Sequence, residues 1–97
     1  HAAVLVCGDV TLEKHKGYWV LDCAAATENV LLAAHSLGLG AVWCGIYPTE
    51  DRVENLKSLL RLPPQIVPFS LVPIGFPAEI KEVPDRFDRN RVHENGW

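Results

Sequence analysis

Residues 38–48, GLGAVWCGIYP, contain the feature of this sequence that most invites a chemical interpretation. Gly45 follows the apolar run Ala41–Trp43, at a position where a strand normally keeps a side chain. A glycine inside a strand pattern is typical of a bulge or of a close approach by another group. At such a strand end a backbone N–H group could reach a ring heteroatom directly. A helix-terminating glycine followed by a bulge fits the spacing equally well, and both interpretations stay open at this point.

Gly38 and Gly40 in the same stretch resemble part of a phosphate-binding loop. The sequence GLGAVWCG lacks the GxGxxG pattern, however, and it leads from a helix into a strand. That order is the reverse of a dinucleotide-binding turn, so we expect no Rossmann site.

The arginines near the C-terminus are a second candidate site. They are Arg86, Arg89 and Arg91. Arginine binds phosphate oxygens through two parallel N–H groups, so a phosphate group is a candidate ligand of these three residues. Asp85 and Asp88 lie among these arginines. That mixture of charges favours ordinary surface ion pairs over phosphate binding.

Other kinds of site find little support in the composition. The net charge is −3 and no cluster of Lys and Arg is present, so nucleic acid is not an expected partner. The apolar runs are too short for a membrane span. Cys7, Cys23 and Cys44 lie in apolar contexts without metal-ligand spacing. We therefore expect buried free thiols, no metal site and a reducing, cytoplasmic location.

The elements that must position these residues alternate between strands and helices, which predicts a layered α/β or α+β architecture. The apolar stretch AAVLVCGD, residues 2–9, predicts a strand that stops at Gly8-Asp9 in a sheet covered on both faces. Residues 40–46 predict a second strand, buried at Ala41–Trp43. Residues 65–75, QIVPFSLVPIG, predict a third strand, whose two prolines favour an edge position or irregular pairing.

Two helices are predicted between these strands. The first covers residues 18–37, with Asp22 as a candidate cap and Gly38 as the left-handed residue that ends it. Its expected apolar face consists of positions 23, 26, 30, 31, 34 and 37. The second helix is capped by Thr49 and ends before Pro63. Its expected buried stripe consists of Val53, Leu56, Leu59 and Leu60.

From Phe76 onward the composition becomes polar and charged, and this part of the sequence has no core of its own. The apolar residues spaced along it are Phe87, Val92 and Trp97. Residues 1–76 are therefore expected to form the sheet and helices, and residues 77–97 an arm on another surface, such as a partner subunit. Because an apolar run follows His1 directly, we expect residues to be missing upstream, so that the chain is a fragment.

Three stretches together resemble the C-terminal half of the FMN-dependent nitroreductase family: DCAAATENVLLAAHSLGLGAVWCGIYP, LLRLPPQIVPFSLVPIGFPAE and DRFDRNRVHENGW. The resemblance implies an α+β fold with a three-layer α/β/α sandwich, of which this chain would supply about three strands, two helices and an extended arm. It also implies a homodimer with FMN at the interface. NAD(P)H would reduce the flavin, which would reduce nitroaromatic, quinone or related acceptors by a ping-pong mechanism. Since the flavin does the chemistry, no side chain is expected to be catalytic.

The resemblance also implies roles for particular residues. The strand end formed by Val42, Trp43, Cys44 and Gly45 would lie beside the flavin ring, with a backbone N–H directed to its reactive N5 edge. An arginine of the arm would hold the FMN phosphate. By position this is Arg86, with Arg89 and Arg91 as substitutes, although Pro84 stands where the family has a lysine.

The family site is built from both halves of the domain, and its N-terminal phosphate-binding stretch is not among these residues. We therefore expect the 97-residue chain alone to have little activity. The alternative is a non-catalytic flavin-binding or dimerisation domain of the same fold. The sequence distinguishes neither NADH from NADPH nor one acceptor from another.

Overall fold

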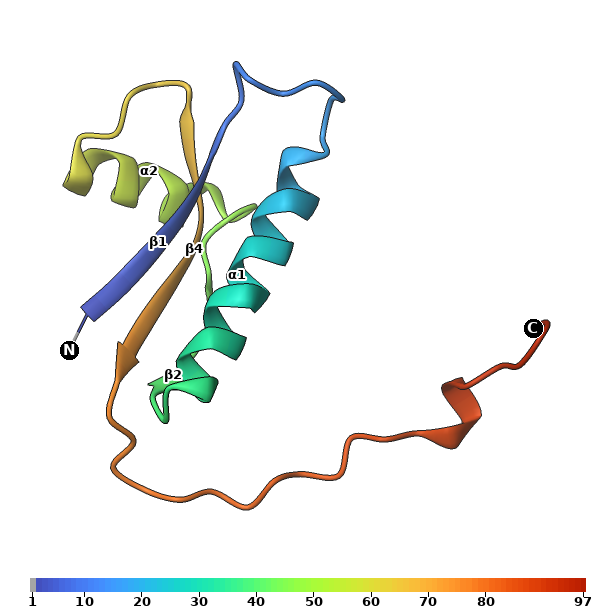
Figure 1. Ribbon diagram of the computed structural model, residues 1–97. Coiled ribbons are helices and arrows are strands. Elements are labelled where there is room, and N and C mark those ends of the chain that lie inside the picture. Colours follow the sequence, from blue (N-terminus) through green and yellow to red (C-terminus); the bar gives the residue numbers. More distant parts are fainter. Residues whose placement is uncertain (1) are drawn as a thin grey trace.

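The computed structural model describes residues 2–97 and has an α+β architecture, with two helices and a four-stranded antiparallel sheet (Figure 1). The elements are β1 (Ala2–Asp9), α1 (Trp19–Ser36), β2 (Gly40–Ala41), β3 (Cys44–Gly45), α2 (Glu50–Leu60), β4 (Ile66–Gly75) and the 3-10 turn η1 (Arg89–Arg91). The predicted α+β fold and its order of elements are confirmed. The sheet has four strands rather than about three because residues 40–46 form two short strands.

The third predicted strand, β4, is the centre of the sheet rather than an edge. It pairs with β1 on one side and with β2 and β3 on the other. The predicted irregular pairing is present: Val6 lies opposite Ser70 and Cys7 opposite Pro68, so Phe69 has no partner in β1. Pro68 has no N–H group to donate to a neighbouring strand. The bulge allows this proline to occupy a central strand while the pairing on either side of the bulge stays regular.

The break between β2 and β3 lies opposite the other proline of β4. Ala41 pairs with Ile74 and Cys44 pairs with Leu71, so residues 42 and 43 face positions 73 and 72. Pro73 has no N–H group to donate across the sheet, and the strand is interrupted at that point. The predicted buried strand at Ala41–Trp43 is therefore wrong, and Val42 is 56% exposed.

The first strand is less covered than its apolar sequence suggests. β1 is an edge strand within this chain, and Ala2, Ala3 and Val4 are exposed. The far end of β1 is tightly packed, because a Cβ atom on Gly8 would lie 2.4 Å from the Trp19 ring. Only glycine fits at this crossing of β1 and α1.

The helix α1 begins at Trp19, and Asp22 lies in its first turn instead of capping it. Its end is as predicted, since Gly38 adopts a left-handed conformation with φ of +71°. The side chains buried against the sheet are Cys23, Thr27 and Ala34. The polar Thr27 thus lies in the middle of the buried face, whereas positions 26 and 37 of the predicted apolar face are exposed.

The helix α2 follows a bend after β3 and contacts β4. Thr49 makes no side-chain capping bond, although its carbonyl oxygen accepts a hydrogen bond from the Val53 N–H at 3.0 Å. Val53 and Leu56 are half-buried, as predicted. The last two residues of the predicted stripe, Leu59 and Leu60, are 76% and 49% exposed. The C-terminal end of the stripe is therefore left uncovered by the part of the chain that the structure describes.

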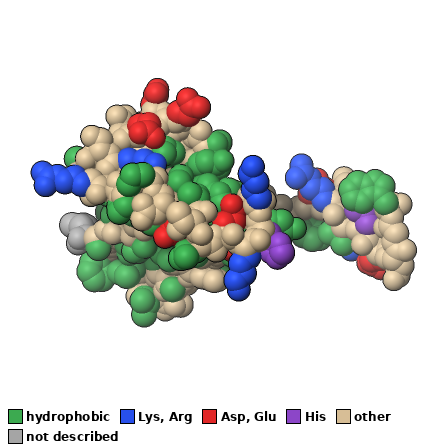
Figure 2. All heavy atoms as spheres, turned by 90° about the horizontal axis from the view of Figure 1, so that it is seen from above, with side chains coloured by type: hydrophobic (Ala, Val, Ile, Leu, Met, Phe, Trp, Pro, Cys, Tyr) green, Lys and Arg blue, Asp and Glu red, His purple; other side chains and the backbone are tan. Residues whose placement is uncertain are grey.

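The C-terminal segment, residues 77–97, extends away from the sheet and helices (Figure 1). It contains no regular element except η1, and all of its residues are exposed. The radius of gyration is 16.5 Å, whereas a compact chain of this length has about 13 Å. Figure 2 shows apolar side chains along the segment, well separated from the main body. Ile80, Val83 and Trp97 are almost completely exposed.

Candidate functional site

The backbone around Gly45 is held in place by hydrogen bonds from several directions. The N–H groups of Ile46 and Tyr47 both donate to the carbonyl oxygen of Phe69, at 3.1 and 3.0 Å. On the opposite side, the Gly45 carbonyl oxygen accepts a hydrogen bond from Arg52 Nη1 at 2.8 Å. A short strand with only two paired residues is thereby fixed at its C-terminal end.

These hydrogen bonds also define the direction of the Gly45 N–H group. Neighbouring residues of a strand direct their backbone N–H groups to opposite sides. Since Ile46 donates toward β4, the N–H of Gly45 is directed away from β4. The Gly45 carbonyl agrees with this orientation, because it meets Arg52 rather than a residue of β4. The free edge of β3 therefore presents a backbone donor.

Within residues 2–97, no contact requires glycine at position 45. Its backbone is not in the left-handed region, and a Cβ atom added there would meet no atom within 4 Å. The bulge that follows involves Ile46 and Tyr47, so it does not require a glycine at position 45 either. Of the two interpretations of this glycine, the close approach of a group from outside these residues is the one that the geometry favours.

A buried pair of hydroxyl groups supports the strand opposite Gly45. Gly45 pairs with Ser70, whose Oγ lies 2.7 Å from Thr27 Oγ1. Thr27 Oγ1 also donates to the Cys23 carbonyl oxygen at 2.7 Å, and both hydroxyl side chains are fully buried. Sequence reasoning missed this pair. The available signal was a polar residue on the apolar face of each element, at Thr27 in the helix and Ser70 in the strand.

An aromatic cluster packs beside the same strand end. The Trp43 and Phe69 ring centroids lie 5.7 Å apart, and those of Trp19 and Tyr47 lie 4.8 Å apart. Trp43 is half-buried and Tyr47 is 39% exposed. A flat ligand at the open edge of β3 would therefore meet apolar and aromatic surface next to the Gly45 backbone.

The three cysteines are free, but their surroundings differ from one another. Cys23 is buried and Cys7 is half-buried, and burial raises the pKa of both thiols, so these groups stay protonated at neutral pH. Cys44 is exposed, and the prediction that all three thiols are buried is wrong at this position. The exposure arises because Cys44 lies in β3, at the open edge beside Gly45.

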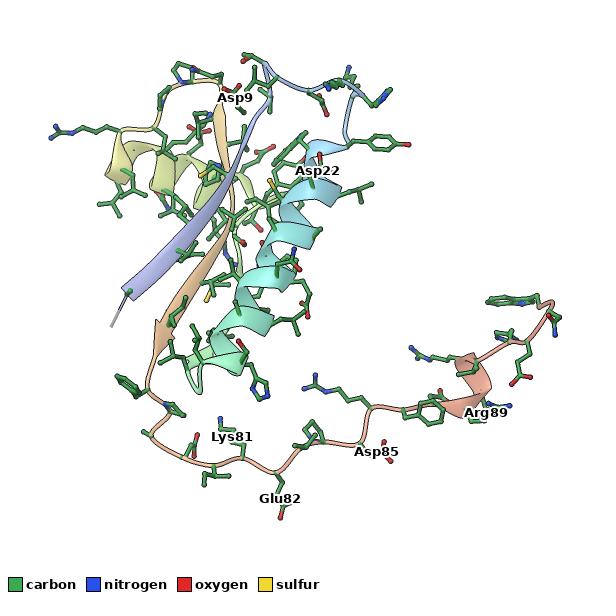
Figure 3. The ribbon with its side chains drawn as sticks, in the orientation of Figure 1. Asp9, Asp22, Lys81, Glu82, Asp85 and Arg89 are labelled. Carbon is green, nitrogen blue, oxygen red and sulfur yellow. The ribbon has the colours of Figure 1, made fainter. Side chains whose placement is uncertain are left out.

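The predicted arginines lie far from the strand end in this chain. Figure 3 shows Arg89 near the end of the C-terminal segment, remote from the sheet. Its Nη2 atom lies 3.2 Å from Glu94 Oε1, and the Nε atom of Arg91 lies 3.4 Å from Asp88 Oδ2. One chain thus brings Val42, Trp43, Cys44 and Gly45 together, but it does not bring Arg86 or Arg89 to them.

Within residues 2–97, no helix has both the length and the apolar character needed to cross a membrane. Over the same residues, no three or more His, Cys, Asp or Glu side chains are grouped so that they could bind a metal ion.

Comparisons with known proteins define the class. The model of the nitroreductase family matches residues 2–76, and this chain belongs to that family. A candidate NADH dehydrogenase/NAD(P)H nitroreductase from Methanothermobacter thermautotrophicus is 54% identical over 95 residues, which cover 98% of this chain and 50% of that protein. The chain therefore spans about half the length of this relative.

Solved structures agree with the assignment. A protein of the same name from Bacteroides thetaiotaomicron superposes with a TM-score of 0.90 and 43% identity, over 98% of this chain and 55% of that one. A candidate nitroreductase from Desulfovibrio desulfuricans, solved in complex with FMN, gives a TM-score of 0.79 and 28% identity. That match covers 98% of this chain and 55% of the other. The α+β chain described above thus corresponds to part of a nitroreductase fold.

Proposed function

We propose that the complete protein is an FMN-dependent oxidoreductase that uses NAD(P)H to reduce nitroaromatic, quinone or related acceptors by a ping-pong mechanism. The observation that carries this proposal is the open position at Gly45, where the backbone N–H faces away from β4 and an added Cβ would meet no atom within 4 Å. Family membership supports it, as do one relative named for NAD(P)H and another solved with FMN.

The residues at this edge fit a flat cofactor. Val42, Trp43, Cys44 and Gly45 would line one side of the isoalloxazine ring, with the Gly45 N–H directed to its N5 edge. FMN, when bound, supplies the site that accepts a hydride from the nicotinamide. The protein positions the ring, donates the backbone hydrogen bond and restricts access of water.

The C-terminal segment would complete the site in a homodimer. Arg89, near the end of this segment, lies remote from the sheet of its own chain (Figure 3). In our proposal Arg86 or Arg89 binds the FMN phosphate at the interface with a second copy. The exposed apolar residues of the segment, including Ile80 and Phe87, would become buried against that copy.

We expect the complete protein, purified and incubated with FMN, to keep a visible flavin band after the excess is removed. NAD(P)H should bleach that band anaerobically, and an acceptor such as a quinone should restore it. The isolated chain 1–97 should keep almost no flavin, because it lacks half of the domain length of its relatives. Both spectra are measured under the same conditions.

Three outcomes would count against these expectations. A complete protein that remains colourless after reconstitution would exclude FMN as its cofactor. A retained flavin that NAD(P)H does not reduce would support a flavin-binding protein without turnover instead. Stoichiometric flavin in the isolated chain would show that the missing half is not needed for binding.

A further inference from the structure

Arg52 is a cation in an electrostatically unfavourable position. It is the third residue of α2, next to Glu50 and Asp51. The first turn of a helix carries partial positive charge and favours anions, so Glu50 and Asp51 are well placed there and Arg52 is not. Within residues 2–97, none of the ion pairs closer than 4.0 Å involves Arg52. Helix stability therefore does not account for this arginine.

The contact that Arg52 does make is with the candidate site. Its Nη1 atom donates to the Gly45 carbonyl oxygen at 2.8 Å, across the bend between β3 and α2. A hydrogen bond from a charged donor is about twice as strong as a neutral one. The remaining N–H groups of the guanidinium stay available beside the same edge of β3.

The carbonyl and N–H groups of one extended residue point to the same side of a strand. Fixing the Gly45 carbonyl therefore also limits rotation of the neighbouring peptide group that carries the Gly45 N–H. We propose that Arg52 is a positioning residue, which holds the Gly45 backbone so that its N–H meets the cofactor, and which places a positive charge beside the cofactor ring. This inference rests on the proposed function, because it assumes that FMN occupies the edge of β3.

Variants of the complete protein test this role. Arg52→Gln removes the charge and the fork, whereas Arg52→Lys keeps the charge without the planar fork. Arg61→Gln is the matched control, since it makes the same substitution at the exposed C-cap position of the same helix. Three quantities are measured: FMN affinity, the midpoint potential of bound FMN, and hydrogen exchange of the Gly45 amide in the FMN-free protein.

For Arg52→Gln we expect roughly tenfold weaker FMN binding, which corresponds to a charged hydrogen bond near the low end of its range. The midpoint potential should fall, because less positive charge stabilises the reduced flavin. The Gly45 amide should exchange faster even without FMN. Arg52→Lys should restore the potential more completely than the affinity, and Arg61→Gln should match the wild type in all three.

The outcomes separate this inference from the proposed function. A wild-type protein that binds no FMN overturns both. Wild-type binding together with unchanged affinity, potential and amide exchange in Arg52→Gln overturns only the role of Arg52. Wild-type affinity and amide exchange in Arg52→Lys would show that charge alone suffices, which would overturn the positioning role.

Discussion

Replacing Gly45 with valine is expected to abolish detectable FMN binding while leaving the protein folded. The substitution is tolerated by the chain itself, because a Cβ at this position meets no atom within 4 Å and the backbone is not left-handed. A β-branched residue also suits a strand. The added methyl groups would instead occupy the space that we assign to the flavin ring. FMN affinity, measured by fluorescence titration, should fall at least about a hundredfold, or roughly 3 kcal/mol.

The size of the side chain and its location provide the controls. Gly45→Ala should give an intermediate loss of affinity, because it adds a single methyl group. Gly40→Ala lies on the same edge of the sheet, where a Cβ would make ordinary contacts at 3.6 Å or more, and should bind FMN as the wild type does. If Gly45→Val were folded and bound FMN normally, the ring could not lie against this residue.

The second large effect concerns stability. Thr27→Val should destabilise the FMN-free complete protein by about 1–3 kcal/mol, because it leaves the fully buried Ser70 hydroxyl without its partner. Valine keeps the shape and the β-branched character of threonine, so packing and helix propensity change little. Urea denaturation should show a lower midpoint with an unchanged slope.

Three further variants identify the cause of that loss. Ser70→Ala should cost less, because Thr27 keeps its hydrogen bond to the Cys23 carbonyl. The double variant should cost less than the sum of the single ones, since the two side chains form one pair. Ser36→Ala removes a comparable bond, to the Ala33 carbonyl, at an exposed position and should change stability by less than about 0.5 kcal/mol. Equal losses at Thr27 and Ser36 would contradict the importance of the buried pair.

The sequence predicted those features of the fold that depend on interactions between neighbouring residues. The helix end at Gly38 follows from the left-handed conformation that glycine adopts without strain. The two helices follow from their apolar periodicity. The central position of β4 was not predictable. Its two prolines favoured either irregular pairing, which is present, or an edge position, which is wrong. Strand order depends on long-range pairing, which no local pattern specifies.

Several residues that were expected to be buried are exposed in this chain. The apolar run of β1 indicated a strand covered on both faces, and residues 41–43 indicated a buried strand. Ala2–Val4 and Val42 are nevertheless exposed in this chain. The chain spans about half of a relative's length. In our proposal these apolar residues contact parts of the complete protein outside the given residues. The same reason applies to Cys44, whose apolar context predicted a buried thiol.

The candidate site was predictable in part. The unusual glycine at position 45 was visible in the sequence, but the contacts that fix it were not. Arg52 is seven residues further along the chain and looks like an ordinary surface charge at the start of a helix. Whether Arg86 or Arg89 completes the site stays a prediction, because in our proposal that contact is made with a second copy of the chain.

The crystal structure of the complete protein with FMN bound tests the central claim most directly. We predict that the isoalloxazine ring lies against residues 42–45, with the Gly45 N–H within hydrogen-bonding distance of N5 and no side chain between them. FMN bound elsewhere, or a side chain of the missing half filling the space at Gly45, would contradict this account.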